Sequence, residues 1–367
     1  MTRASRVLIS GYYGFANAGD EAILAGLVAG FRQLAPSLEL TVLSGNPAAT
    51  ASEHGVRASR RGLLSARTQL RSADLLISGG GGLLQDATSW RSPLYYLAVL
   101  RLAGRGRCRT ACLAHGIGPL RRKWIRALAR GTLSQVDLLT VRDRRSAEAL
   151  GELGVTRPAE VTADLAFLLP APAKDEVIAA REKADLPPSN GPQLGLALRR
   201  PPGPPRRGLA AFLARGIGAA SLEVGLRPVF VPMQRPRDLD FAAEVAAQLP
   251  LPSDTISAPL ATRELLALLG GFDVVVAMRL HALIFAALCG RPPVAISYDP
   301  KVDGLMEELG LRPAAHTDRL NPDDLSGAVL AAWQERARLP AALAPHVARL
   351  RAAALRNIRL ALALLGG

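Results

Sequence analysis

Aromatic side chains and cysteines are scarce in this sequence of 367 residues. Aromatics make up 4% of the chain, whereas apolar residues make up 49%. A core must therefore be built mostly from alanine, leucine and valine. The three cysteines, Cys108, Cys112 and Cys289, lie in or beside apolar runs, and an odd number cannot all pair. This pattern is typical of small buried hydrophobic residues in a reducing compartment.

Lysine is almost absent, although the chain is strongly basic. The formal net charge is +14, and the 45 cationic side chains include only the lysines Lys123, Lys174, Lys183 and Lys301. One interpretation is a compositional bias toward arginine, and the other is attraction to an anionic partner such as a phosphorylated substrate or an acidic membrane surface. Nucleic acid is not expected as a partner, because the arginines are scattered and no zinc-finger, RNP or helix-turn-helix signature gathers them.

The sequence also lacks long apolar runs. No stretch approaches the roughly 18 uncharged apolar residues of a transmembrane helix. The start of the chain shows neither a long apolar segment nor a cleavage site of a secretory signal. No cluster of histidine, cysteine and acidic residues has the spacing of metal ligands. We therefore expect a cytoplasmic protein without a metal, soluble or at most peripheral to the inner face of the membrane.

What the sequence does contain is a regular alternation of short apolar runs and longer helical patterns, the rhythm of βαβ units around a parallel sheet. The runs predict strands near residues 7–10, 39–43, 74–78, 110–114, 138–141 and 161–163, and then near 194–198, 229–232, 274–277 and 294–297. Helices are predicted near 20–33, 93–103, 121–132, 145–153, 208–223, 239–248, 263–269, 281–288, 302–309 and 339–365.

This order predicts an α/β protein of two Rossmann-like, doubly wound domains that face a cleft. The first domain is expected at 1–170 and the second at 193–335, with a proline-rich linker and its short polar helix at 171–192. The tail, 336–367, is expected to form a helix that packs back on the first domain, with an amphipathic surface helix as the alternative. Ligands of such sheets collect at the carboxyl ends of the strands, so the search for a site starts there.

The first predicted strand ends in a glycine-rich turn that opens a helix. Gly14 and Asn17 lie in this turn, whose free backbone N–H groups suit an anion. The spacing of the glycines matches neither a dinucleotide fingerprint nor a Walker loop. Asp20 has two interpretations that the spacing leaves open: a residue favoured by the helix dipole, or a carboxylate that acts on a sugar hydroxyl.

Four consecutive glycines, Gly79 to Gly82, follow the third predicted strand. Such a run costs backbone entropy, and an ordinary tight turn needs only one or two glycines. We therefore expect a ligand to approach the main chain at Gly80, Gly81 and Gly82.

Two more strand ends in the first half carry polar side chains. His115 follows the strand near 110–114, where a histidine is either structural or in contact with substrate. Arg142 follows directly after the strand at 138–141, which would place it at the cleft.

The second half carries the strongest local pattern. Arg279 and His281 interrupt an otherwise apolar segment from Val274 to Cys289, at the end of a strand and the start of a helix. This arrangement combines an anion-binding group with a titratable neighbour. Lys301 follows the next strand and is either an ordinary loop lysine or a compact ammonium that the site needs.

Together, Arg142, Arg279 and Lys301 offer three cations for one small ligand that carries both a phosphate and a carboxylate. Each charge-assisted hydrogen bond to such a ligand would contribute roughly 1.5–3 kcal/mol.

Six segments of the chain, in this order, resemble the polysaccharide pyruvyl transferase family, specifically its CsaB-type bacterial members. No single segment is diagnostic, but the six are spread over most of the chain, from residue 11 to residue 302. The segments are GYYGFANAGDEA at 11–22, SGGGGLLQD at 78–86, AHGIGP at 114–119, VRDRRS at 141–146, MRLHA at 278–282 and SYDPKV at 297–302.

The resemblance implies a glycosyltransferase-B-like (GT-B-like) fold and phosphoenolpyruvate as co-substrate, with no further cofactor. It implies a pyruvate ketal on a sugar, typically N-acetylmannosamine of a secondary cell-wall polymer precursor carried on a lipid diphosphate. The product would anchor S-layer proteins. The first domain would bind the acceptor and the second phosphoenolpyruvate. The family's arginine, arginine–histidine pair and lysine fall on Arg142, Arg279, His281 and Lys301.

The mechanism that follows gives His281 the role of general acid toward the methylene carbon and Asp20 that of base for the sugar hydroxyl. The proline- and arginine-rich segment 199–207 departs from the family pattern, so no acceptor contact is expected there. One alternative is a glycosyltransferase that uses a nucleotide sugar in the same fold, although the sequence shows no acidic ribose-binding motif. Another is a non-catalytic protein that binds an acidic ligand.

Overall fold

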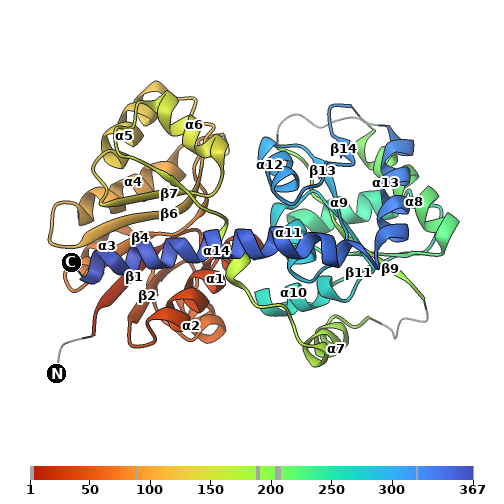
Figure 1. Cartoon of the computed structure of the whole chain (residues 1–367), viewed down its shortest axis with the longest axis horizontal. Helices are drawn as coiled ribbons and strands as arrows, with labels where there is room; N and C mark the ends of the chain where they lie inside the picture. The colour runs from red at the N-terminus through yellow and green to blue at the C-terminus, as the bar shows by residue number, and fades with distance from the viewer. Residues whose placement is uncertain (1–3, 88, 187–190, 203–207, 320, 367) are drawn as a thin grey trace. The chain divides into compact units, whose positions relative to one another are not determined.

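The chain divides into two compact units, each built around one parallel sheet (Figure 1). The first unit comprises Met1–Leu169 and Arg349–Gly367, and the second comprises Pro170–Ala348. The structure, a computed structural model, describes residues 4–87, 89–186, 191–202, 208–319 and 321–366.

The sheet of the first unit has eight strands in the order β3-β2-β1-β4-β6-β7-β8, with β5 paired to β6. Because the chain starts in the middle of the sheet and later returns to the other side of β1, the strand order reverses between β1 and β4. The strands are β1 (Arg6–Ser10), β2 (Glu39–Ser44), β3 (Arg57–Arg60), β4 (Leu75–Ser78), β5 (Gly81–Leu84), β6 (Arg109–Ile117), β7 (Leu138–Val141) and β8 (Glu160–Val161).

Helices cover both faces of this sheet, since successive side chains of each strand point to opposite faces. Leu8 and Leu76 pack toward α3, α4, α5 and α6, whereas Val7 and Leu75 pack toward α1 and the end of the C-terminal helix α14. The helices are α1 (Ala18–Leu34), α2 (Pro47–His54), α3 (Leu63–Leu70), α4 (Arg91–Ala103), α5 (Lys123–Leu133), α6 (Arg144–Leu153), the 3₁₀ turn η1 (Leu165–Leu168) and the part of α14 (Leu339–Gly366) that starts at Arg349.

The second unit has a six-stranded parallel sheet with the order β11-β10-β9-β12-β13-β14. This is the strand order of a dinucleotide-binding fold, and here it reverses between β9 and β12. The strands are β9 (Gln193–Ala197), β10 (Arg227–Phe230), β11 (Asp254–Thr255), β12 (Val274–Ala277), β13 (Pro293–Ser297) and β14 (Ala315–His316).

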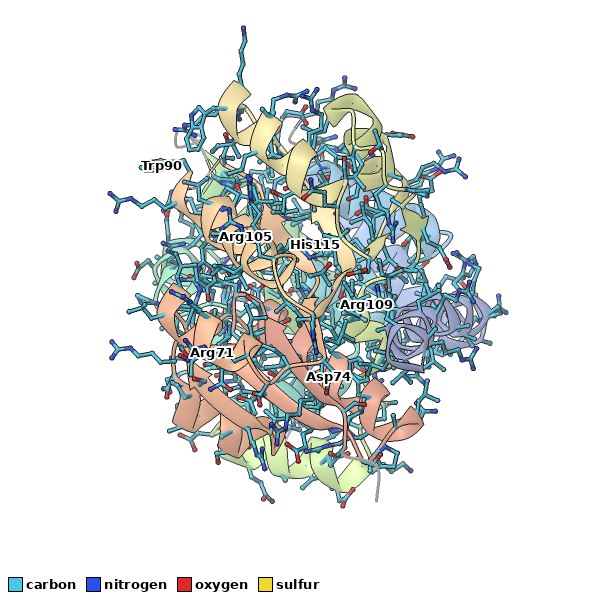
Figure 2. All side chains as sticks on the ribbon, turned by 90° about the vertical axis from the view of Figure 1, so that its left-hand side faces the viewer. Arg71, Asp74, Trp90, Arg105, Arg109 and His115 are labelled. Atoms are coloured by element: carbon cyan, nitrogen blue, oxygen red, sulfur yellow. The ribbon has the colours of Figure 1, made fainter. Side chains whose placement is uncertain are left out.

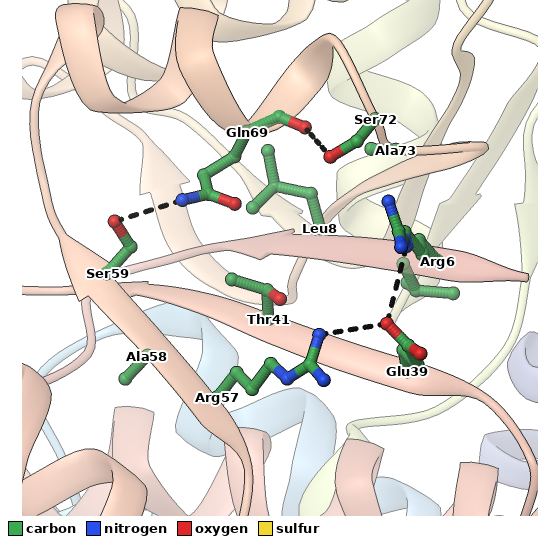
Figure 3. A pocket seen from close by; sticks show the side chains of 11 residues that line it. Arg6, Leu8, Glu39, Thr41, Arg57, Ala58, Ser59, Gln69, Ser72 and Ala73 are labelled. Carbon is green, nitrogen blue, oxygen red and sulfur yellow. Dashed lines mark hydrogen bonds and ion pairs between the residues drawn. The ribbon is translucent and has the colours of Figure 1, made fainter.

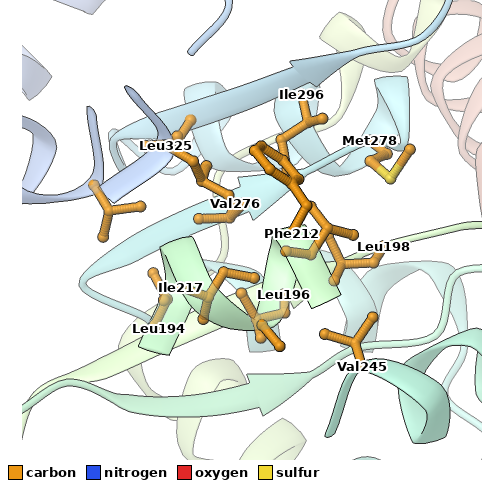
Figure 4. Packing of buried hydrophobic residues seen from close by; sticks show 14 of the residues in the cluster. Leu194, Leu196, Leu198, Phe212, Ile217, Val245, Val276, Met278, Ile296 and Leu325 are labelled. Carbon is orange, nitrogen blue, oxygen red and sulfur yellow. The ribbon is translucent and has the colours of Figure 1, made fainter. Parts of the chain in front are cut away.

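Leucine, valine and isoleucine fill the core of the second unit (Figure 4). Leu196, Val276 and Ile296 of three adjacent strands pack against Phe212 and Leu325 of two helices. The helices of this unit are α7 (Lys174–Lys183), α8 (Leu209–Val224), α9 (Arg237–Ala246), α10 (Thr262–Gly270), α11 (Leu280–Leu288), α12 (Pro300–Glu308) and α13 (Pro322–Glu335).

The segment expected as a linker is part of the second unit. Its helix α7 lies against α10, where Arg263 Nη2 is 2.6 Å from Glu176 Oε2 and Lys183 Nζ is 2.6 Å from Glu264 Oε1. Arg263 and the backbone N–H of Ala173 lower the pKa of Glu176 to about 2, so its carboxylate stays charged. The proline-rich composition of this segment therefore did not distinguish a flexible linker from a segment that ion pairs attach to a domain.

The end of α14 is fixed in the first unit by a buried amide. Asn357 is fully buried, and its Oδ1 accepts hydrogen bonds from Thr140 Oγ1 and from Thr162 Oγ1 at 3.0 Å. Its Nδ2 donates to Ala354 O at 3.1 Å. The tail helix is thus joined to β7 and to the residue after β8 by side-chain hydrogen bonds as well as by apolar packing.

All three cysteines have unreactive thiols. Cys108 and Cys112 are buried, Cys289 is partly exposed, and none forms a disulfide. Burial raises the pKa of each of the three thiols to about 12. They therefore serve packing, as their apolar neighbours in the sequence indicate.

Among the described helices, none combines the length and the apolar character that crossing a bilayer requires.

Replacing Asn357 by Ala should lower the free energy of unfolding by about 2 kcal/mol, because two buried threonine hydroxyls lose their acceptor. Urea unfolding followed by circular dichroism measures the change. Arg359→Ala, at an exposed position of the same helix, is the control and should change stability by no more than about 0.5 kcal/mol. Equal effects of the two substitutions would show that the amide does not hold the helix.

Candidate active site

The polar segments singled out in the sequence follow the carboxyl ends of strands in both units. In the first unit β1 and β4 are adjacent, with Ser10 in register with Ser78. The turn after β1 and the glycine run after β4 therefore start side by side at the point where the strand order reverses. This is the edge where open α/β sheets collect ligands.

Contacts within the turn after β1 account for two of its residues. Gly14 has a φ of +77°, and a Cβ there would meet Ser44 Oγ at 2.1 Å. Its N–H donates to Glu21 Oε1 at 2.8 Å. Asn17 caps α1 by accepting from Gly19 N at 3.3 Å. Gly14 and Asn17, both expected to bind substrate, thus have roles in folding that need no ligand.

Packing within the first unit also explains why most of the four positions after β4 are glycine. A Cβ at Gly79 would meet Tyr13 Oη at 2.1 Å, and a Cβ at Gly80 would meet Ala114 O at 2.8 Å. Gly81 has a φ of +89° and starts β5. Only Gly82 is exposed and has open space at the position of a Cβ. Of the run, Gly82 is therefore the position that a ligand can approach.

Asp20 lies in the first turn of α1, beside the glycine run. A Cβ at Gly81 would be 3.1 Å from Asp20 Oδ1, and Asn17 Nδ2 donates to Asp20 Oδ2. Tyr13 is fully buried nearby, and burial together with the Asp20 carboxylate raises the pKa of Tyr13 well above its ordinary value. Asp20 is partly exposed at the ligand-collecting edge, which is compatible with action on a hydroxyl group.

His115 is completely buried in β6, in the interior of the unit (Figure 2). Its Nε2 lies 3.0 Å from the carbonyl oxygen of Ser78, to which the neutral ring donates. Burial lowers the pKa of His115 to about 4; the Ser78 carbonyl opposes this shift and the Arg142 cation adds to it. Such burial argues against direct contact with a substrate. His115 instead has a structural role, because its hydrogen bond links β6 to β4.

Arg142 leaves β7 at its carboxyl end but is held by carboxylates. Its Nε is 3.2 Å from Asp143 Oδ2 and its Nη1 is 3.4 Å from Asp164 Oδ2, with 9% of the residue exposed. A Cβ at Gly116 would lie 2.8 Å from Nη2 of this guanidinium. Two acidic partners balance the charge of Arg142. This pairing was not predicted from the sequence.

Arg279 in the second unit is likewise engaged. It follows β12 and begins α11, and its Nε donates to Asp238 Oδ2 at 3.0 Å while its Nη2 donates to Asp238 Oδ1 and, at 3.2 Å, to Gln234 Oε1. Asp238 is buried on α9 and also accepts from the backbone N–H groups of Met233 and Gln234. This bidentate pair fixes the orientation of the guanidinium at the end of the strand.

His281 and Lys301 lie near the starts of neighbouring helices. His281 is in the first turn of α11, two residues after Arg279, and is half-buried. Lys301 is in the first turn of α12, with Nζ 3.2 Å from Asp299 Oδ2 and 5.7 Å from the centre of the Tyr298 ring. Both side chains belong to elements that follow adjacent strands, β12 and β13.

Arg199 is a further cation of this edge that sequence reasoning missed. Its Nη1 donates to Tyr298 Oη at 3.2 Å, and its guanidinium lies 5.2 Å from the centre of that ring. Ala197 of β9 is paired with Ala277 of the adjacent strand β12. Arg199 and Arg279 each follow two residues after their member of this pair, so they occupy equivalent positions at the ends of the two strands. The same rule that selected Arg279 could have found Arg199, which directly follows the strand predicted near 194–198. It was passed over because the proline- and arginine-rich segment 199–207 departs from the family pattern.

The second unit therefore carries three cations after three adjacent strands. Arg199 follows β9, Arg279 follows β12 and Lys301 follows β13, with Tyr298 in contact with the first and last of them. Asp238 and Asp299 offset part of the charge. Arg142 belongs to the first unit and Arg279 and Lys301 to the second, so the common site expected for these three cations stays a prediction.

Within the described ranges, no group of three or more histidine, cysteine or acidic side chains is arranged to hold a metal ion.

A pocket of about 470 Å³ lies at the opposite ends of the first unit's strands (Figure 3). Its lining includes the amino ends of β1, β2 and β3, and Glu39 is 3.3 Å from Arg6 Nε and 2.9 Å from Arg57 Nη1. Asp74 and Arg109 mark the same amino edge in Figure 2, where Arg109 N donates to Asp74 O. None of the segments singled out in the sequence reaches this pocket, so we do not assign it to the active site.

The fold is shared with several solved structures that are distant in sequence. A glycosyltransferase from Rickettsia africae is 11% identical, with 99% of both chains covered and a TM-score of 0.65. Alr3699/HepE of Anabaena, solved in complex with UDP-glucose, is 14% identical over 98% of both chains, with a TM-score of 0.60. MnaA of S. aureus, solved with UDP, is 13% identical over 96% of this chain and 95% of that one, with a TM-score of 0.59. The two-unit parallel α/β architecture is thus GT-B-like.

The family is shown by the sequence itself. A model of the polysaccharide pyruvyl transferase family matches residues 17–300. The chain belongs to this family, which confirms the resemblance seen in the sequence, and the membership indicates an enzyme that transfers a pyruvyl group to a saccharide. A comparison with curated protein sequences finds no match.

Because the folded protein keeps His115 neutral, stability should fall as pH drops below the unfolded pKa of about 6.5 and level off near the folded pKa of about 4. Between pH 7 and pH 5 this one group should cost about 2 kcal/mol. Urea unfolding at both pH values should show that His115→Gln removes this part of the pH dependence. The control His316→Gln, at an exposed position, should retain it; an unchanged slope in His115→Gln would contradict the assignment.

Proposed function

We propose that the protein transfers the pyruvyl group of phosphoenolpyruvate to a sugar and forms a cyclic pyruvate ketal. The acceptor we propose is N-acetylmannosamine of a lipid-diphosphate-linked precursor of a secondary cell-wall polymer, made at the cytoplasmic side of the membrane and used to anchor S-layer proteins. The observation that carries the proposal is the row of cations, Arg199, Arg279 and Lys301, after three adjacent strands of the second unit.

Phosphoenolpyruvate suits this edge because it is a small anion with a phosphate and a carboxylate. Asp238 and Gln234 accept from Nε and Nη2 of Arg279 and so orient the guanidinium, and we propose that its Nη1 donates to one of these groups. Lys301 and Arg199 lie against the same tyrosine ring, so they offer further positive charge from a common support. The carboxylates at this edge keep the cations oriented before the ligand binds, which is favourable for electrostatic catalysis.

The reaction consumes two sugar hydroxyls. His281 donates a proton to the methylene carbon of phosphoenolpyruvate, which becomes a methyl group and leaves an oxocarbenium-like carbon beside it. A sugar hydroxyl, deprotonated by Asp20, attacks that carbon. The C–O bond to phosphate then breaks, and a second hydroxyl closes the ring. The two sugar hydroxyls release two protons. One of them restores the proton that His281 gave to the methylene carbon, and the other leaves with phosphate.

The role of Arg142 in this proposal is secondary. Its guanidinium is anchored by Asp143 and Asp164, and we propose that it adds positive potential near the acceptor side of the reaction. Gly82, the exposed glycine of the run after β4, leaves room for the acceptor next to Asp20.

The overall proposal is tested by phosphate release from phosphoenolpyruvate in the presence of a panel of acceptors. The panel contains a lipid-diphosphate disaccharide with N-acetylmannosamine, the same disaccharide without lipid, and a water blank. UDP-glucose and UDP-N-acetylglucosamine replace phosphoenolpyruvate in parallel reactions. Phosphate release that depends on an acceptor supports the proposal, whereas transfer from a nucleotide sugar alone would replace it with a glycosyltransferase.

Lys301→Ala and Arg199→Ala should each weaken phosphoenolpyruvate binding by about 10- to 100-fold, because each removes a charge-assisted hydrogen bond. Isothermal titration with phosphoenolpyruvate measures the change. Lys174→Ala, which removes an exposed lysine of the same unit, is the matched control and should bind normally. Undiminished binding by Lys301→Ala and Arg199→Ala would place the donor elsewhere.

His281→Ala should reduce kcat by about 10²- to 10⁴-fold, the usual contribution of a general acid, while the Kd for phosphoenolpyruvate changes little. A phosphate-release assay measures kcat, and isothermal titration with phosphoenolpyruvate measures Kd. His316→Ala serves as the histidine control. A variant with near-normal kcat would remove His281 from the proton transfer, and one with an equal loss in binding would make it a ligand-binding residue.

A further inference from the structure

Arg61 is a cation of the first unit that neither the sequence motifs nor the proposed reaction uses. It follows β3 directly, and its backbone N–H donates to Ser44 O at the end of β2 at 2.7 Å. Arg61 therefore stands at the carboxyl edge of the sheet, the edge that also carries the turn after β1 and the glycine run.

Aromatic rings surround the guanidinium of Arg61. Its central carbon lies 3.8 Å from the centre of the Tyr95 ring, 5.4 Å from that of Tyr96 and 5.6 Å from that of Phe15. Tyr12 stacks on Phe15 with ring centres 4.4 Å apart. These contacts hold the planar group in place through its face.

The charge of Arg61 is not balanced by an acid. In the part of the chain that the structure describes, no acidic side chain forms an ion pair with it, in contrast to Arg142 and Arg279. Its Nε is buried without a hydrogen-bond partner. Burial raises the pKa of Tyr95 and of Tyr96, a shift that the Arg61 cation only partly offsets, so both hydroxyls stay neutral. A fixed, uncompensated cation at this edge suits an anionic group of a ligand.

Other polar atoms at this edge also lack partners. Ser78 Oγ, at the end of β4, and Tyr13 Oη are buried without hydrogen bonds. Buried hydroxyls of this kind are normally satisfied, so the cluster points to a bound polar molecule or water.

An exposed apolar pair lies immediately beyond Arg61. Leu63 and Leu64 begin α3, and 46% and 83% of these residues are exposed. Phe15, which contacts Arg61, is 36% exposed. The surface thus places apolar side chains next to an unbalanced cation. A prenyl diphosphate presents the matching order of groups, a charged headgroup followed by hydrocarbon, whereas phosphoenolpyruvate has no hydrocarbon chain.

We propose that Arg61 binds the diphosphate of a lipid-linked acceptor and that Leu63 and Leu64 contact the first part of its lipid chain. This inference rests on the proposed function for the nature of the acceptor. The inference goes beyond the proposed function because it names a surface of the first unit that would bind a lipid-linked saccharide more tightly than a free one.

Titration of the whole chain with farnesyl diphosphate, inorganic pyrophosphate and phosphoenolpyruvate tests the inference. Arg61→Gln should weaken binding of farnesyl diphosphate and pyrophosphate by about 10- to 100-fold and leave phosphoenolpyruvate binding unchanged. Leu64→Ser should weaken only farnesyl diphosphate, by about 3- to 10-fold. Arg60→Gln, which removes the exposed neighbouring arginine, is the matched control.

Normal binding of farnesyl diphosphate by Arg61→Gln would overturn the inference, and so would a loss confined to phosphoenolpyruvate. Because Arg61 packs on tyrosines, Arg61→Lys is measured as well: it keeps the charge, and binding between that of the wild type and Arg61→Gln is expected. Leu64 is too exposed for its replacement to unfold the protein, so equal farnesyl diphosphate binding by Leu64→Ser would refute the lipid contact. Failure of phosphoenolpyruvate to bind the wild type would instead count against the proposed function.

Discussion

A guanidinium at the end of a buried strand needs a counter-charge, and the ion pair between Arg279 and Asp238 supplies it. Removing one partner of such a pair leaves a buried charge uncompensated, which is strongly destabilising. Asp238 is itself satisfied by two backbone N–H groups, so the carboxylate is fixed before it meets the arginine. The position of the proposed donor site therefore depends on a pair that spans α9 and the start of α11, with Lys301 and Arg199 arranged around a neighbouring tyrosine.

The same constraint separates the cations of this protein into two kinds. Arg142 and Arg279 are buried and each has carboxylate partners, which makes them rigid but lowers the net charge they present. Arg61 is held by neutral rings and keeps its full charge. An overall charge of +14 says little about such differences, because the field at a site depends on which arginines are locally balanced.

The sequence predicted the fold class and family correctly because both depend on patterns that are local in the chain. Apolar runs such as Val274–Ala277 become strands with the expected bounds. β5 was missed because its first two residues are glycines, which favour turns, and α3 was missed because Leu63–Leu70 mixes apolar and polar residues without a helical stripe. In both cases pairing or packing with distant segments decides the structure, which local propensity does not report.

The candidate site was predictable only in part. Strand ends pointed to Arg142, Arg279 and Lys301, but the carboxylate partner of Arg279, Asp238, lies 41 residues earlier in the chain and was not predicted. The glycine run was interpreted as evidence of a ligand, yet Gly79 and Gly80 make room for Tyr13 and for a carbonyl of the next strand. Steric reasons of this kind become visible only when the neighbouring chain is in place.

The buried Cys112 gives the first unit an internal reporter of its own opening. It lies in β6, fully enclosed in the sheet, whereas Cys289 of the second unit is partly exposed. Since a protonated, enclosed thiol does not react with alkylating reagents, labelling of Cys112 proceeds only through transient unfolding around it. The rate of this labelling thus makes the local stability of the first unit measurable in the intact chain.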